Sequence, residues 1–409
     1  MSRHPRLDRS IHRLHLLAMI ALSLVFPLTA GACLWDYDTL KQERSRFPTA
    51  LELITGKFPR HSREFYEWRV KDRQQKIAAT GATPELLDDL AVAFDKLGDQ
   101  TQAIATMERA EKLSPGRYET AANLGTFYFH AKQFKAGIPH IERALKINPD
   151  AHFGREKYQL LLVQYLVSKQ VDGKTKLPLA TANASGEVYP VGFREFVLHG
   201  VAADLPVRER EVSQAVAGIL GMMRFGKHDS PILLEVLGDL LYGGEGDRSN
   251  NQQLAARAYL RASDLAQGQP EVSATYRKRA EAVLVMQMGG TGQNGRMELR
   301  DLEPVFQKEL ADAEAWFQTL AQNEHQWVTD GADPEARFTA VYFADPDVPE
   351  LDQKLRTTLA RTRWNPQRLA VVTLSLMGLG LAAFILVRRW LIDHHKSLTE
   401  TINREDLFQ

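Results

Sequence analysis

The sequence has almost no cysteine, because Cys33 is the single thiol in 409 residues. One thiol cannot form an intramolecular disulfide, a Cys-x-x-Cys redox pair or a cysteine-based zinc site. It also cannot form the Cys-x-x-Cys-His motif that attaches haem. Disulfide-stapled, dithiol-redox and cysteine-metal proteins are therefore excluded.

The sequence also lacks an excess of charge of either sign. Lysine plus arginine and aspartate plus glutamate number 51 each, so the formal net charge is zero. A general nucleic-acid-binding protein needs a basic excess to displace counterions from the phosphate backbone. We therefore expect no nucleic-acid partner.

Recognisable catalytic and cofactor motifs are missing as well. The chain has no His-x-x-x-His or His-Glu-x-x-His pair and no Gly-x-Ser-x-Gly nucleophile motif. The glycine-rich run 289–295 lacks the Gly-Lys-Ser/Thr ending of a phosphate loop and follows a helix-like segment, where a strand is required. We expect no cofactor, no metal and no enzyme activity, although a catalytic triad needs no sequence proximity.

Two apolar segments are present. The first, 16–32, follows a leader with four arginines and ends on three small residues, which is typical of an export signal. Pro27 shortens its uninterrupted apolar part, which favours a cleaved signal over an uncleaved amino-terminal anchor. The basic leader predicts that the amino terminus stays in the cytoplasm and that the body is exported.

Cys33 directly follows the small residues of this segment, and the arrangement resembles a bacterial lipoprotein signal. In that family the cysteine is lipidated and becomes the first residue of the mature protein. Ala30 stands where the family prefers leucine, so plain cleavage nearby is the alternative. Cys33 is the lipidation candidate.

The second apolar segment, 369–387, contains no charge. As a helix it would be about 30 Å long, which is enough to span the hydrocarbon core of a bilayer. Two arginines follow it, and Trp364 and Trp390 lie near its ends, as aromatic residues do at membrane interfaces. The pattern predicts one carboxy-terminal transmembrane helix.

This helix would leave the short polar tail 388–409 in the cytoplasm and the body on the extracytoplasmic (periplasmic or outer) face. Gly378 and Ala382 form a small-xxx-small pair that could pack two such helices together. Self-association through them is a second, weaker expectation.

A spacing of 34 residues runs through the body of the chain. Residues at this spacing match in type in four pairs: Pro115 and Pro149, Ala110 and Ala144, Leu90 and Leu124, Phe94 and Tyr128. A fixed period of this length indicates stacked helix–turn–helix repeats. Thr83 and Pro84 add a helix-start signal, with a capping hydroxyl followed by proline at the first helical position.

Residues 84–117 and 118–151 resemble tetratricopeptide repeats. The residues that carry the resemblance are the small positions, the second-helix core and the closing prolines: Ala103 and Gly137, Met107 and Ile141, Ala110 and Ala144, Pro115 and Pro149. Leu87 and Ala121 replace the family's first tryptophan, whereas Gly125 keeps its glycine. The resemblance implies an all-α fold of helix–turn–helix repeats. Together with the irregular segment 171–207 and the apolar run 369–387, the sequence predicts two helical lobes and one carboxy-terminal transmembrane helix.

In this family the first helix of each repeat lines a concave groove that holds a protein or peptide. Carried over position by position, the groove residues are Asp88, Val92, Asp95, Lys96, Ala122, Asn123, Thr126, Phe129 and His130. The resemblance implies a peptide ligand with Phe129 as its apolar anchor. Asp88 and Val92 occupy the positions of the basic clamp that some members use, so no such clamp is expected. The alternative is a set of solvated helix-face residues, since two or three repeats make a shallow groove.

The rest of the body is less regular. A third, stretched repeat is expected from Ser230, with Gly238 in its first helix, Tyr259 in its second, and the loop 243–251 lengthening the turn by about five residues. A short strand at 191–198 and a helix over 299–325 with one buried stripe are further expectations.

The predicted organisation follows in chain order: 1–32 export signal or amino-terminal anchor, 33–83 lead-in with a helix, 84–170 tetratricopeptide repeats and capping helix, 171–207 irregular linker, 208–288 second helical lobe, 289–368 helical membrane-proximal region, 369–387 transmembrane helix and 388–409 tail.

These patterns favour a membrane-anchored scaffold or adaptor that binds other proteins at the cell envelope. Two alternatives stay open. One is a structural anchor that acts through its tail, and the other is an envelope enzyme without a recognisable motif.

Overall fold

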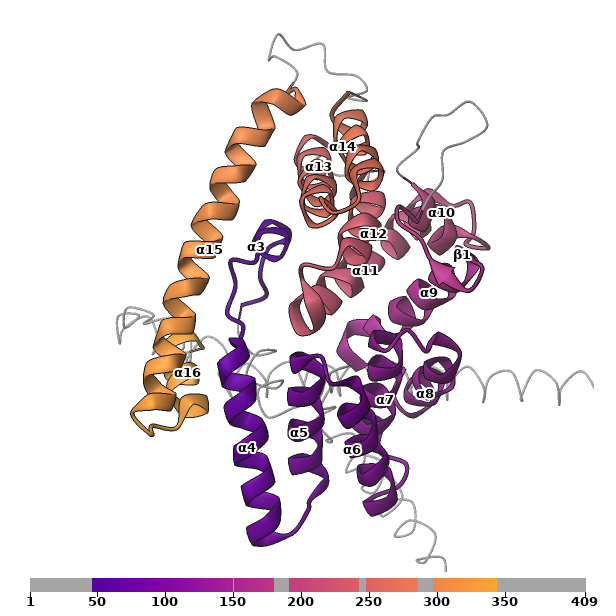
Figure 1. Ribbon diagram of the computed structural model, residues 1–409. Helices are drawn as coiled ribbons and strands as arrows, with labels where there is room; N and C mark the ends of the chain where they lie inside the picture. Colours follow the sequence, from indigo (N-terminus) through magenta and orange to yellow (C-terminus); the bar gives the residue numbers. More distant parts are fainter. Residues whose placement is uncertain (1–45, 150, 180–190, 243–247, 286–296, 344–409) are drawn as a thin grey trace, which may run out of the picture. The chain divides into compact units, whose positions relative to one another are not determined.

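The computed structural model describes residues 46–149, 151–179, 191–242, 248–285 and 297–343, and this part is helical apart from one short hairpin (Figure 1). The helices are α3 (Ala50–Thr55), α4 (Arg63–Thr80), α5 (Pro84–Leu97), α6 (Gln100–Leu113), α7 (Tyr118–His130), α8 (Phe134–Ile147), the 3₁₀ turn η1 (Ala151–Gly154), α9 (Arg155–Ser168), α10 (Gly192–Leu198), α11 (Leu205–Met222), the π-helical segment η2 (Met223–Lys227), α12 (Pro231–Tyr242), α13 (Arg248–Leu265), α14 (Pro270–Val285), α15 (Leu299–Thr329) and α16 (Pro334–Tyr342).

The first helix of the first repeat, α5, is capped at both ends by residues suited to those positions. The Thr83 hydroxyl accepts the backbone N–H of Leu86 at 3.3 Å, and Pro84 occupies the first helical position of α5. Gly98 ends the helix with a φ of 89°, a left-handed conformation that glycine adopts without strain. The predicted start of this helix is confirmed.

Each repeat is a pair of packed helices, α5 with α6 and α7 with α8. The second pair approaches closely because both contact positions are glycine. A Cβ atom on Gly125 would lie 2.5 Å from the Ile141 side chain, and one on Gly137 would lie 2.4 Å from the Phe129 ring. In the first pair Ala103 takes the small position and is fully buried. The core positions predicted from the repeat are confirmed.

A similar contact joins α12 and α13. A Cβ atom on Gly238 would lie 2.6 Å from the Tyr259 ring. These two residues are 21 positions apart, whereas Gly125 and Ile141 are 16 apart, which agrees with a turn lengthened by about five residues. That α12 and α13 form a degenerate tetratricopeptide repeat stays a prediction.

The connection between the two sets of hairpins is more ordered than the expected linker. Strands β1 (Gln170–Val171) and β2 (Lys174–Thr175) pair antiparallel around Asp172 and Gly173, whose φ values are 52° and 72°. An Asp-Gly pair with two positive φ values is a favoured hairpin turn.

The strand expected at 191–198 is wrong, because α10 occupies those residues. Its helical spacing buries Phe193, Val197 and Leu198. The backbone N–H of Phe193 also donates to Asp239 of α12 at 2.9 Å. The described residues of the segment 171–207 therefore include one strand of a hairpin and the packed helix α10.

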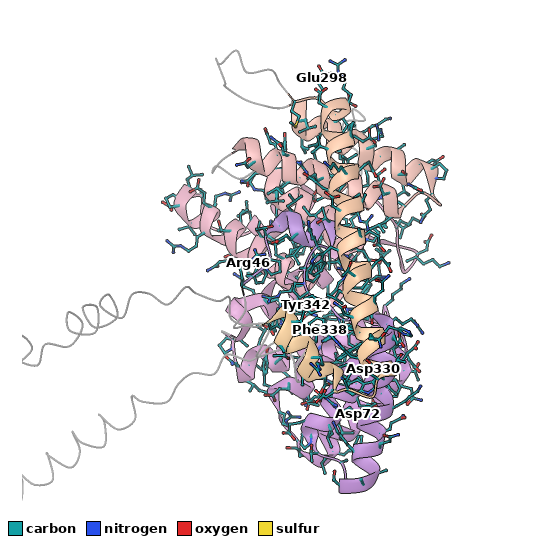
Figure 2. The ribbon with its side chains drawn as sticks, turned by 90° about the vertical axis from the view of Figure 1, so that its left-hand side faces the viewer. Arg46, Asp72, Glu298, Asp330, Phe338 and Tyr342 are labelled. Atoms are coloured by element: carbon teal, nitrogen blue, oxygen red, sulfur yellow. The ribbon has the colours of Figure 1, made fainter. Side chains whose placement is uncertain are left out.

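The long helix α15 contacts α3, α4, α13 and α14. Figure 2 shows Glu298 and Asp330 at its two ends, with α16 turned back beside it. Tyr342 of α16 accepts a hydrogen bond from Asn323 at 2.9 Å, and the ring of Trp316 lies 6.1 Å from that of Tyr342. The helix expected over 299–325 is confirmed.

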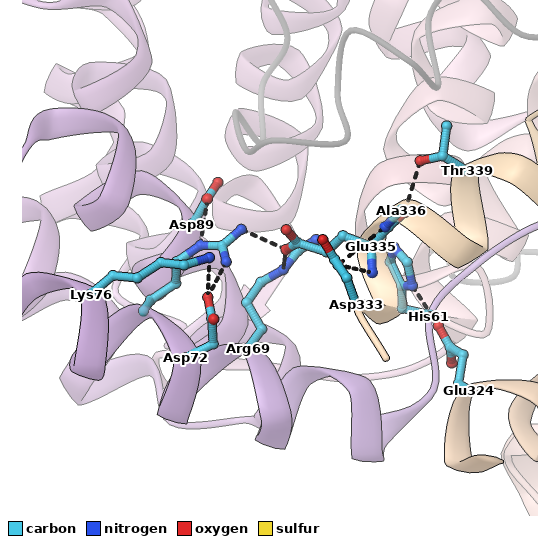
Figure 3. Close-up of polar contacts among 11 residues, drawn as sticks. His61, Arg69, Asp72, Lys76, Asp89, Glu324, Asp333, Glu335, Ala336 and Thr339 are labelled. Carbon is cyan, nitrogen blue, oxygen red and sulfur yellow. Dashed lines mark hydrogen bonds and ion pairs between the residues drawn. The ribbon is translucent and has the colours of Figure 1, made fainter. Parts of the chain in front are cut away.

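Buried ion pairs join α16 to α4 (Figure 3). Glu335 accepts from the Arg69 guanidinium at 2.8 Å and from that of Arg73 at 2.5 Å. Arg73 also donates to Asp89 of α5 at 2.8 Å. Because Arg69 and Arg73 are almost fully buried, removing Glu335 would leave two guanidinium groups without this counterion.

A second polar contact joins α15 to the turn before α4. The His61 ring lies 2.6 Å from one oxygen of Glu324, and the other oxygen accepts the backbone N–H of Ser62 at 2.7 Å (Figure 3). Both side chains are buried. Together with Glu335, this contact fixes the last described helices against α4 and the turn before it.

Within the described ranges no helix is both long and apolar enough to cross a membrane. The predicted export signal, Cys33, the segment 369–387 with Gly378 and Ala382, the tail 388–409 and the run 289–295 lie outside the described residues.

We expect Gly137→Val to destabilise the protein by about 2 kcal/mol, because the new side chain would overlap the Phe129 ring and the Gly125 carbonyl oxygen. Chemical denaturation of the full-length chain measures the change. Ala136→Val is the matched control, since Ala136 is exposed on the same helix. Equal denaturation midpoints for the two variants would contradict the close approach.

Candidate partner-binding site

The four groove residues predicted on α5 are in contact with other parts of the chain. Asp88 is 1% exposed and accepts from Arg117 at 2.8 Å, and Val92 packs in the core of the first repeat. Asp95 lies 2.8 Å from the His130 ring. The Lys96 ammonium donates to backbone carbonyls of η2. The chain itself therefore covers Asp88 and Asp95, whereas Val92 and Lys96 lie in the lining of a second, smaller cavity.

Burial outweighs the Arg117 ion pair in its effect on Asp88, and raises the pKa of that carboxyl to about 7. An aspartate in this position is a poor solvated contact for a ligand.

The five predicted residues on α7 divide into two groups. Ala122 and Asn123 are fully buried and face neighbouring helices. Thr126 and Phe129 are 5% and 8% exposed, whereas His130 is exposed. These last three line a cavity. The role of all nine groove residues in binding a partner stays a prediction.

This cavity, the α7–α9 cavity, has a volume of about 740 Å³. Its walls come from the end of α7, the start of α8, α9, the β hairpin, η2 and the start of α12. Its apolar lining is Phe129, Phe134, Leu162, Val163, Leu166, Leu177, Met222, Phe225, Ile232 and Leu233. A concave, mainly apolar site of this size is typical of a ligand-binding pocket.

The rim of the α7–α9 cavity is cationic. Lys132, Lys174 and Lys227 are exposed, and none of them forms an ion pair with a described residue. Arg155 lies deeper, with its guanidinium 4.6 Å from the Phe225 ring centroid. The described lining contains no aspartate or glutamate. The rim therefore favours an acidic ligand.

One hydrogen-bond acceptor inside the cavity is unused. Gln159 is 7% exposed, and its amide nitrogen donates to the Thr126 hydroxyl at 3.0 Å. That hydroxyl in turn donates to the Ala122 carbonyl at 2.9 Å. The Gln159 side-chain oxygen has no partner among the described residues. A buried acceptor without a donor is costly, so a ligand N–H there would be stabilising.

The sequence reasoning placed three of these residues, Thr126, Phe129 and His130, on one face of α7. It missed Gln159, Lys174 and the η2 wall. The Asp172-Gly173 pair is a hairpin signal that would have located the Lys174 side of the cavity. No repeat period indicates η2.

The paired helices, the 34-residue period and the small contact residues define a helical-repeat protein. The sequence model of the tetratricopeptide repeat matches residues 84–117 and 118–151, so the chain contains two tetratricopeptide repeats. No curated protein matches the chain.

A buried ionic cluster in the second set of hairpins is the strongest candidate for catalytic groups. Glu235 accepts from Arg279 at 2.6 Å and from Tyr276 at 2.7 Å, and Asp239 accepts from Tyr259 at 2.6 Å. All five side chains are fully buried. These five residues bond to one another and do not line the α7–α9 cavity, so the cluster holds α12, α13 and α14 together. Within the described ranges no three potential ligands gather for a metal ion.

Burial raises the pKa of Asp239 to about 7, with Glu235 adding to the shift and Arg279 opposing it. Because the folded state holds this proton more tightly than the unfolded chain, the stabilising contribution is fully present below about pH 4. It is lost as the pH rises through about 7.

We therefore expect Asp239→Asn to flatten the loss of stability between about pH 4 and pH 7, by about 1 kcal/mol per pH unit near the midpoint of that range. Thermal unfolding at a series of pH values measures the slope. Asp312→Asn, at an exposed position of α15, is the control and should keep the wild-type slope. A wild-type slope in Asp239→Asn would show that Asp239 is ionised throughout.

Proposed function

We propose that this protein is a membrane-anchored scaffold that binds an apolar, acidic polypeptide segment in the α7–α9 cavity. The observation that carries the proposal is a combination of three features beside the second tetratricopeptide repeat. They are an apolar floor, a rim of three lysines without an ion-pair partner among the described residues, and a buried Gln159 oxygen that accepts no hydrogen bond from them. Such repeats generally bind protein or peptide partners, and the chemistry of this cavity defines what the partner offers.

A polypeptide satisfies the three requirements at once. Its apolar side chains would cover the floor, which includes Leu162 and Leu166 of α9. A backbone N–H would donate to the Gln159 oxygen, and acidic side chains would pair with Lys132 and Lys174 at the rim. Apolar burial supplies most of the affinity, whereas the rim charges select the partner and its orientation.

The predicted groove residues keep a role in this proposal. Phe129 is the apolar anchor on the α7 side, and Thr126 orients Gln159. Asp88, Val92 and Asn123 act indirectly, because their buried contacts hold α5 and α7 in place. Asp95 sets the position of His130 at the edge of the cavity.

The proposal includes export of the body, which the basic leader supports, and anchoring by 369–387, which the absence of charge in that apolar run supports. A membrane anchor would confine the search for partners to one surface. Lipidation of Cys33 would hold the other end of the mature chain as well.

Selection from a displayed library of random peptides tests the cavity. We expect full-length wild-type protein in detergent to enrich apolar peptides that carry acidic residues. The variant Lys132→Glu with Lys174→Glu should bind the enriched peptides at least about tenfold more weakly, because two attractive contacts become repulsive.

The matched control is Lys135→Glu with Lys176→Glu. These two lysines are exposed and lie within three positions of the rim lysines in sequence, but do not line the cavity. The control should bind within about twofold of wild type. Equal losses in both variants would reduce the effect to overall charge, and no enriched peptide would contradict the proposed function.

Membrane anchoring has a separate test. In a Cys33→Ser background, we expect deletion of 369–387 to move the protein from the membrane to the soluble fraction after alkaline washing, because no other uncharged apolar run follows the repeats. A variant with the residues of 369–387 in scrambled order should stay in the membrane. Soluble wild-type protein would contradict the anchor.

A further inference from the structure

A second cavity shares lining residues of η2 with the α7–α9 cavity. This smaller cavity, the α4–α5 cavity, has a volume of about 270 Å³. Three segments distant in sequence form it: the turn 58–61 with the start of α4, the end of α5, and η2 with the residues that follow it. Phe225, Gly226 and Lys227 line both cavities, so η2 is their common wall.

The lining of the α4–α5 cavity is strongly cationic. It contains five permanent cations and one carboxylate, which are Arg60, Arg63, Lys96, Arg224, Lys227 and Asp229. Some of these charges have partners in the chain, since Arg63 pairs with Glu67 at 2.9 Å and Lys96 donates to backbone carbonyls. The Arg224 guanidinium lies over the Phe47 ring, 5.0 Å from its centroid. Asp229 is the single carboxylate in the described lining, beside five cations.

Arg60 is the most informative of these cations. Its guanidinium lies 3.6 Å from the Phe317 ring centroid, donates to the Gly56 carbonyl and forms no ion pair with a described residue. Burial lowers the pKa of Arg60 to about 10; Glu314 and Asp229 attract the charge, whereas Arg261 repels it. A partly buried guanidinium without a close counterion is costly, and a bound oxyanion would offset that cost.

The pKa of His228 also reflects the positive charge around the α4–α5 cavity. Its ring lies edge-on to Phe58, with ring centroids 5.4 Å apart. Burial and then Arg60 lower the pKa of His228 to about 3; Arg261 and Lys96 lower it further, and Asp229 opposes them. The neutral ring is a hydrogen-bonding group in a positive environment, within the lining of the cavity.

The chemistry of these groups favours phosphate over other anions. A phosphate monoester carries a charge of about −1.5 to −2 near pH 7 and presents three acceptor oxygens. Arginine guanidinium groups match its geometry with two parallel hydrogen bonds, and lysines add point charges. A carboxylate, with one charge and two oxygens, would leave more of the cation excess uncompensated.

We propose that the α4–α5 cavity binds a phosphate group, carried either by a small soluble molecule or by a lipid headgroup. Arg60 is the central ligand, with Arg63 and Arg224 at its sides. This inference stands apart from the peptide-binding proposal. Because Lys227 lines both cavities, it is left out of the test.

The test is calorimetric titration of the full-length chain in nonionic detergent at fixed ionic strength. The probes are inorganic phosphate, short-chain dihexanoyl phosphatidic acid and acetate. We expect saturable binding of a phosphate probe with a dissociation constant below about 1 mM. Binding of inorganic phosphate identifies a soluble source, and binding of the lipid alone identifies a headgroup.

Arg60→Lys keeps the charge but removes the two-pronged hydrogen bonding, and Arg63→Gln removes an exposed charge at the edge. We expect each to weaken binding about tenfold. The control Lys57→Gln, exposed and outside the lining, should bind within about twofold of wild type. If Arg60→Lys does not fold, as judged by thermal unfolding, Arg63→Gln alone decides.

Three results would overturn the inference. They are the absence of saturable phosphate binding by wild type, equal affinity for acetate, and equal losses in Lys57→Gln and Arg63→Gln. None of these results bears on the peptide selection, because neither Arg60 nor Arg63 lines the α7–α9 cavity.

Discussion

The contact between α5 and η2 is the constraint on which both cavities depend. The Lys96 ammonium donates to the carbonyl oxygens of Phe225 and Gly226 at 2.5 and 2.7 Å. Gly226 departs from helical geometry, with φ −98° and ψ −109°, so these carbonyls lack the partners of a regular helix. Lysine satisfies them across a separation of 129 and 130 positions. The segment η2 thus lines both the mainly apolar α7–α9 cavity and the cationic α4–α5 cavity.

Contacts within the repeats also change how the predicted tetratricopeptide groove is filled. In a free array the first helices present a solvated concave face, whereas here Asp88 and Asp95 face side chains of the second repeat and of the turn before it. Asp88 and Asp95 become buried partners of Arg117 and His130. Breaking a buried pair from one side leaves a charge uncompensated and costs about 3–5 kcal/mol. Substitution of Asp88 would therefore report on folding before it reported on binding, and the rim lysines are the cleaner probes.

The sequence predicts the features that lie within one helical hairpin, because caps, small contact residues and the 34-residue period are all local patterns. The capping hydroxyl of Thr83, the small residues at 103 and 137, and the lengthened spacing between Gly238 and Tyr259 all follow from patterns within one hairpin. Periodicity carries no information on partners that lie far apart along the chain.

His61 and Glu324 show this limit, because they are 263 positions apart and come from a turn and from a helix outside the repeats. The helix α3 and the π-helical η2 also escape prediction, since each is six residues long or shorter and has no apolar period to detect. The candidate site is recovered in part for the same reason. Its α7 side belongs to a repeat, whereas its remaining walls are assembled by tertiary packing.

Buried ion pairs attach α16, the last described helix, to α4 and through it to the first repeat. Glu335 of α16 lies between Arg69 and Arg73 of α4, and Arg73 continues to Asp89 of α5. In a membrane-anchored chain, a pull on the segment after α16 would pass through this network to the first repeat. Because Arg69 and Arg73 are buried, separating α16 from α4 would leave two guanidinium groups without their shared carboxylate, and this cost would oppose detachment of α16.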